Sequence, residues 1–150
     1  MQFEIDTVYV AFDAAPRPAA DEITSHRCCE CDRVRDDLAR FRARDVPDDV
    51  LSYHGDSIPL LTPKAFRYFL PRYIQFTCDH PGENATEILL FNLSPEVPSS
   101  EFWSGRCDDF SDPERESILR YLAYRKTWRD AYLDAGEIER AIRFWLHHEL

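Results

Sequence analysis

Three cysteines and one histidine fall within six positions near the start of the chain, in the stretch "HRCCEC" from His26 to Cys31. His26, Cys28 and Cys31 have the residue types and the close spacing of zinc ligands. A tetrahedral zinc site needs a fourth ligand. The candidates for it are Cys78, His80 and Cys107. The chain offers no second pair of ligands at zinc-finger spacing, so the motif predicts zinc only if one of these distant residues joins it.

The same cysteines support two other interpretations. Cys28 and Cys31 continue an apolar stripe with Val34, Leu38 and Phe41 at helical spacing, and small buried thiols pack as modest hydrophobic groups. A Cys-x-x-Cys pair at the start of a helix can also have a lowered thiol pKa and take part in redox chemistry. Core packing, zinc binding and thiol chemistry therefore all stay open.

Acidic residues outnumber basic ones, 28 to 18, and the formal net charge is −10. This balance argues against a nucleic-acid-binding surface and favours a basic protein partner. The alternative is that the charge only keeps the protein soluble. The carboxylates expected to face a partner are Asp36, Asp37, Asp48, Asp49, Asp108, Asp109 and Asp112.

Apolar periodicity predicts an all-α fold, a single compact domain spanning residues 1–150 with about five to six helices and a C-terminal antiparallel helical hairpin. Helices are expected near residues 3–12, 28–43, 62–80, 85–93, 113–132 and 138–146. The segment "TVYVAF" also suits a strand because it is rich in β-branched and aromatic residues. Residues 47–59 are expected to form a loop, and Pro71 is expected to kink or break its helix. Asp112 is predicted to cap the fifth helix, and Gly136 to end it in a left-handed conformation.

No catalytic motif, secretory signal or apolar run approaching the ~20 residues of a membrane span occurs in the chain. We therefore expect a cytoplasmic protein that binds neither membrane nor nucleic acid. In a reducing compartment, five cysteines are thiols or metal ligands and do not form a disulfide framework.

The chain resembles a family of uncharacterised bacterial proteins. The resemblance rests on "HRCCEC" followed by a charged helix, on "LLTPKAFRYFLPRYI", on Phe110 and on "YLAY", and it covers most of the chain. Its more specific element is the Ala-Phe-Arg-Tyr-Phe-Leu-Pro segment, in which Arg67, Tyr68 and Pro71 match. The resemblance implies a small bacterial helical domain and transfers no catalytic residue.

These observations predict a small acidic cytosolic bacterial binding protein of the immunity or antitoxin type, which neutralises a basic toxin or effector by direct contact. The alternative is a zinc- or thiol-dependent protein that uses His26, Cys28 and Cys31.

Overall fold

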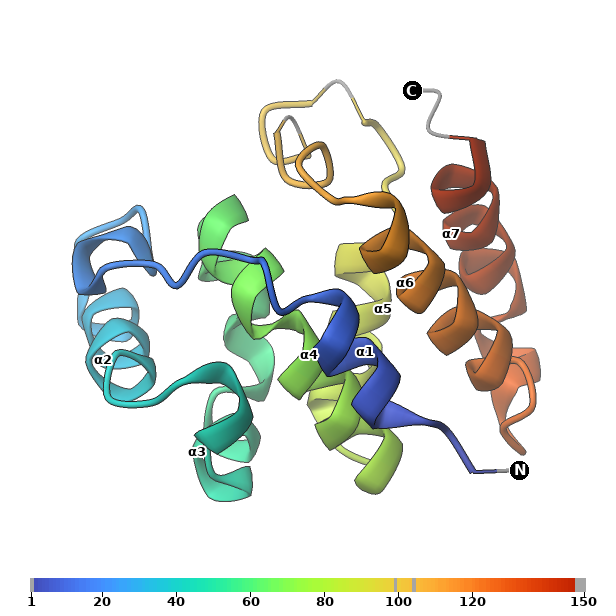
Figure 1. Ribbon diagram of the computed structural model, residues 1–150, viewed down its shortest axis with the longest axis horizontal. Coiled ribbons are helices and arrows are strands. Elements are labelled where there is room, and N and C mark those ends of the chain that lie inside the picture. The colour runs from blue at the N-terminus through green and yellow to red at the C-terminus, as the bar shows by residue number, and fades with distance from the viewer. Residues whose placement is uncertain (1, 99, 104, 148–150) are drawn as a thin grey trace.

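The computed structural model describes residues 2–98, 100–103 and 105–147, and helices form its framework (Figure 1). Within these ranges the α-helices are α1 (Ile5–Ala11), α2 (Cys29–Leu38), α3 (Asp48–Tyr53), α4 (Pro63–Asp79), α5 (Asn84–Leu93), α6 (Asp112–Arg125) and α7 (Ala135–His147). Short 3-10 helices connect them: η1 (Ala20–Glu22), η2 (Ala43–Asp45), η3 (Gly55–Leu60) and η4 (Ala131–Leu133). The described part of the chain has no β-strand, only an isolated bridge between Thr24 and Leu61. The predicted all-α fold is confirmed.

The helices agree with the predicted ones at the N-terminus and differ from them further along the chain. "TVYVAF" lies mostly in α1 and forms no strand. The predicted loop at 47–59 contains α3 and most of η3, which raises the number of helices above the five to six expected. Acidic side chains in the first turn of α3 favour it, because they complement the positive end of a helix. The helices predicted at residues 28–43 and 113–132 are shorter in the structure: α2 ends at Leu38, and α6 ends at Arg125.

Helix α4 is the central helix of the fold, and ten of its seventeen residues are buried. Its start was predicted correctly: the Thr62 side chain accepts a hydrogen bond from the Ala65 N–H, and Pro63 follows the cap. The helix does not break at Pro71, since it runs without interruption to Asp79, and the predicted kink stays a prediction. A proline inside a helix costs about 3 kcal/mol. Burying a large apolar side chain contributes about 1.5–3 kcal/mol, so the buried side chains of α4 offset that cost.

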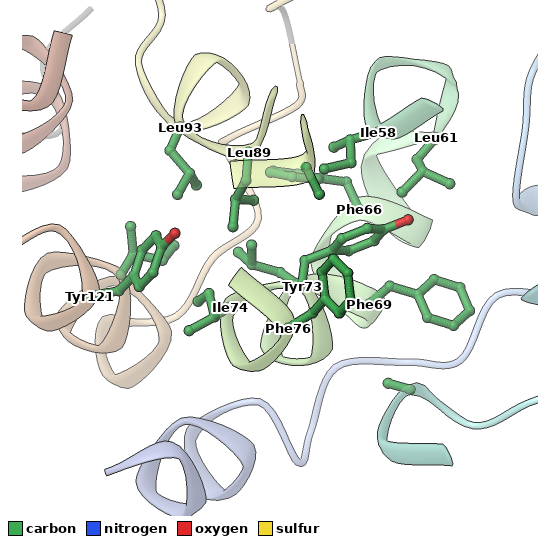
Figure 2. Packing of buried hydrophobic residues seen from close by; sticks show 14 of the residues in the cluster. Ile58, Leu61, Phe66, Phe69, Tyr73, Ile74, Phe76, Leu89, Leu93 and Tyr121 are labelled. Carbon is green, nitrogen blue, oxygen red and sulfur yellow. The ribbon is translucent and has the colours of Figure 1, made fainter. Parts of the chain in front are cut away.

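The hydrophobic core surrounds α4, whose aromatic side chains meet α5, α6 and η3 (Figure 2). Tyr73 and Phe76 of α4 are at most 1% exposed, as is Tyr121 of α6. The Tyr121 hydroxyl is hydrogen-bonded to the hydroxyl of Thr77 at 2.8 Å, so the polar end of this buried ring is satisfied. Trp145 of α7 likewise donates to the Leu93 carbonyl at 2.8 Å, which fixes α7 against α5.

Two charged side chains inside the fold join distant segments. Glu114 is fully buried and accepts three hydrogen bonds, at 2.8 to 3.1 Å, from the Arg67 guanidinium. It also accepts one from the Ser111 N–H, while its own N–H donates to the Ser111 hydroxyl. Ser111, and not the predicted Asp112, is therefore the cap of α6. Arg106 donates to the carbonyls of Ile58 and Leu61 and to the Asn92 side chain, and so joins η3 to α5.

The C-terminal helices α6 and α7 lie side by side and run in opposite directions (Figure 1). Gly136, predicted to end the preceding helix in a left-handed conformation, instead lies in the first turn of α7. In the described ranges of the chain, no helix has the length and apolar character that crossing a membrane would require.

Candidate functional site

The N-terminus of α2 carries the three closely spaced thiols. Cys28 is the N-cap residue, in extended backbone conformation, and its Sγ accepts a hydrogen bond from the Cys31 N–H at 3.3 Å. A sulfur thus takes the capping position that serine, threonine, aspartate or asparagine usually occupies. Cys28 and Cys29 are exposed, whereas Cys31 is 1% exposed. The core-packing interpretation therefore fits Cys31 and does not fit Cys28.

The environments of these two thiols shift their pKa values in opposite directions. Hydrogen bonds from the backbone N–H of Cys31, and then from its side chain, lower the pKa of Cys28. Burial is the main cause that raises the pKa of Cys31 to about 11. The exposed thiol is therefore the more readily ionised of the pair, and the buried one stays protonated near neutral pH.

A cavity of about 340 Å³ adjoins this end of α2. It is lined by Cys29, Glu30, Arg33, Tyr53, His54 and Ser57. The polar lining residues are held by hydrogen bonds: Arg33 donates to the Tyr53 hydroxyl at 2.6 Å, and Ser57 donates to Glu30 at 3.4 Å. The residues that line this cavity, between α2, α3 and η3, thus include a thiol, an imidazole and two charged groups.

His54 is held in this cavity by a carboxylate of α2. Its Nε2 lies 2.7 Å from Oδ2 of Asp37, and the residue is only 3% exposed. A carboxylate on one ring nitrogen fixes the orientation of an imidazole, and this is how carboxylates support histidines in many functional sites. Asp37, expected to face a partner, has this internal role instead. Sequence analysis missed the pair because seventeen positions separate the two residues.

The predicted zinc ligands do not form a metal site in the part of the chain that the structure describes. There, no three side chains of His, Cys, Asp or Glu gather closely enough to hold a metal ion. The candidates for the fourth ligand are engaged or buried elsewhere: the His80 Nε2 lies 2.9 Å from Asp48, and burial raises the pKa of both Cys78 and Cys107 to about 12. Zinc binding by His26, Cys28 and Cys31 stays a prediction without a structural argument for it.

The seven predicted partner-binding carboxylates fall into two groups. Asp36 pairs with Arg35, Asp37 with His54, and Asp48 with both Arg72 and His80. These three are occupied within the molecule. The other four are exposed and take part in no ion pair among the described residues. They are Asp49, Asp108, Asp109 and Asp112.

The exposed carboxylates lie on different parts of the molecule. Asp49 belongs to α3, which is well separated in Figure 1 from the loop that precedes α6. The seven predicted residues are therefore not gathered on one part of the molecule. The structure adds Glu83 to the α3 region, since its carboxylate accepts a hydrogen bond from Ser52 at 3.1 Å. Only the fold brings Ser52 and Glu83 together, because thirty-one positions separate them.

Four exposed carboxylates lie close together in the chain, in the loop before α6 and at the start of that helix, and are called here the acidic loop surface: Asp108, Asp109, Asp112 and Glu116. Two aromatic side chains precede it in the chain, one in α5 and one in the segment between α5 and α6. Phe91 and Phe102 are 39% and 38% exposed, and their ring centroids are 6.2 Å apart. The guanidinium of Arg106 lies 5.0 Å from the centroid of the Phe102 ring, which connects this pair to the segment that bears the carboxylates. Exposed aromatic side chains are enriched at protein-binding surfaces.

No protein-family model, curated protein or solved structure matches this chain. The resemblance to an uncharacterised bacterial family therefore stays a prediction, and the functional argument rests on the residues themselves.

Proposed function

We propose that this protein is a binding protein that engages a basic protein partner through the acidic loop surface and the exposed aromatic pair Phe91 and Phe102. The observation that carries the proposal is that exposed carboxylates and exposed aromatic rings both occur in the segment from α5 to the start of α6. Aromatic side chains contribute affinity where water is excluded, and exposed carboxylates attract and orient a cationic partner.

The pairing of charges elsewhere in the molecule supports this choice of surface. Buried and half-buried carboxylates such as Glu114 and Asp134 are matched by arginines within the fold. The four carboxylates of the acidic loop surface are in no ion pair among the described residues. The adjacent Arg115 donates its Nε–H to the Phe110 carbonyl at 3.1 Å. In a chain of net charge −10, this surface is available to an external cation.

The partner class follows from the same chemistry. A small acidic protein that covers a cationic surface of another protein can neutralise it without catalysis, as immunity proteins and antitoxins do. We propose a basic toxin or effector domain as the partner and the cytoplasm as the place of binding.

The experiment is a pull-down with the product of the neighbouring gene, using two variants of equal charge change. Asp108→Lys/Asp109→Lys reverses two charges on the acidic loop surface. Asp49→Lys/Asp79→Lys reverses two exposed charges away from it, one on α3 and one at the end of α4. Asp48 is left intact because it holds Arg72 and His80.

We expect the loop variant to lose the partner and the control variant to retain it. Equal retention by both variants would exclude this surface as the interface. Equal loss would show that only the total charge matters.

A further inference from the structure

We propose that Cys28 and Cys31 form a redox-active dithiol, which exchanges with a substrate disulfide and changes reversibly between two thiols and an intramolecular disulfide. This site is separate from the acidic loop surface and does not depend on the proposed binding function.

The geometry places the two sulfurs as an attacking and a resolving thiol. Residues three apart lie on the same face of a helix, so Cys31 lies one turn along from Cys28. The Cys31 N–H donates to the Cys28 Sγ at 3.3 Å, which brings the exposed sulfur over the first turn of the helix. Cys31 is 1% exposed, so a bulky disulfide reaches Cys28 first.

The helix end favours the anionic form of the attacking sulfur. Unpaired N–H groups and the helix dipole at an N-terminus stabilise negative charge, and a thiolate there is a better nucleophile than an ordinary thiol. Cys28 receives one of these N–H groups directly.

The reaction balances without any further reagent. The Cys28 thiolate attacks one sulfur of the substrate disulfide, whose S–S bond breaks, and the departing thiolate takes up a proton. The Cys31 sulfur then attacks the Cys28 sulfur of the mixed disulfide, and its proton passes to the second departing thiolate. The protein is oxidised to the Cys28–Cys31 disulfide, and the substrate is reduced to two thiols.

Cys29, at the same helix end, serves as an internal control for Cys28. It is exposed, like Cys28, and occupies the next position, but the structure gives its sulfur no hydrogen bond to a described residue. If exposure alone decided reactivity, the two thiols would react alike. If the capping geometry decides it, Cys28 reacts first and Cys29 is dispensable.

The experiment treats the purified full chain with oxidised glutathione, blocks the remaining thiols and locates all adducts by peptide mass spectrometry. We expect the wild-type protein to form a disulfide between Cys28 and Cys31. Cys31→Ser should accumulate a glutathione adduct on Cys28, Cys28→Ser should lose both products, and Cys29→Ser should behave as wild type. Serine is a good N-cap, so Cys28→Ser keeps the helix cap while removing the sulfur.

A second arm replaces glutathione with a peptide that contains one disulfide, and distinguishes small-molecule from protein substrates. The proposal is overturned if the wild-type protein forms no Cys28–Cys31 disulfide in either arm. It is also overturned if the adduct in Cys31→Ser lies on Cys29. Circular dichroism of each variant confirms that the fold is retained.

Discussion

Replacing Arg67 with methionine should destabilise the protein strongly, because the buried Glu114 would lose the cation that pairs with it. Glu114 is fully buried and accepts three hydrogen bonds from Arg67, whose own side chain is 19% exposed. Removing one partner of a buried ion pair costs about 3–5 kcal/mol. A domain of this size has a total stability of about 5–15 kcal/mol, so a large part of it would be lost. The expected fall in Tm is roughly 6–20 °C.

Urea unfolding followed by tryptophan fluorescence measures this loss, and a second substitution tests its cause. Glu114→Gln removes the buried charge but keeps an oxygen that can accept the Ser111 N–H, which now donates to the carboxylate at 2.8 Å. The double variant Arg67→Met/Glu114→Gln should therefore be more stable than Arg67→Met alone, by about 1 kcal/mol or more. A cost below about 1 kcal/mol for Arg67→Met would refute the reasoning. So would a double variant less stable than Arg67→Met.

Two further predictions concern local contacts of α4 and α3. Thr62→Ala removes the side chain that accepts the Ala65 N–H, and should lower the free energy of unfolding by about 1 kcal/mol in the same urea assay, whereas Thr62→Ser should restore most of it. The pKa of Asp48 is held below its ordinary value by hydrogen bonds from Arg72 and then His80. A carboxyl group with a lowered folded-state pKa contributes stability above its unfolded pKa of about 3.9 and loses it as the pH falls through the folded value. Acidification below about pH 4 should therefore destabilise the wild-type protein more than Asp48→Asn, as thermal melts across that range would show. Parallel losses in the two proteins would mean that other groups dominate.

Local signals in the sequence predicted several parts of the fold. Thr62 followed by Pro63 marks the start of α4 because a capping oxygen and a fixed φ both favour a first turn. The α1 segment was ambiguous because its apolar spacing favours a helix, whereas its β-branched and aromatic residues favour a strand. The short helix α3 was missed because Pro47, Gly55 and Pro59 all favour loops, and only packing against α4 and α5 selects the helix.

For the functional residues as well, some features could be predicted from the sequence and others depend on the fold. The clustering of Cys28 and Cys31 is visible in the sequence, and so is their helical spacing. Which of the two is exposed depends on packing, and hence no sequence pattern showed it. The contact between Arg67 and Glu114 spans forty-seven positions, so it exists only once α4 and α6 have come together.

Sequence analysis also treated all exposed acids alike. Whether an aspartate is available to a partner depends on its distance from the nearest cation in the folded protein. Asp48 was indistinguishable from Asp49 in the sequence, yet the former pairs with Arg72 and the latter with no cation in the described ranges. The seven predicted carboxylates therefore differ in how freely they can meet a cation, and the partner-binding set stays a prediction.

The most direct test of the proposed function is the salt dependence of the association rate with the basic partner. Exposed charges are screened over about 8–10 Å at physiological ionic strength, so steering by the acidic loop surface weakens as salt rises. We predict that association of the wild-type protein slows as salt increases from low to physiological concentration. Asp108→Lys/Asp109→Lys should associate more slowly at low salt and show a much weaker dependence. A wild-type rate that is independent of salt, or a salt dependence unchanged in this variant, would contradict the proposal.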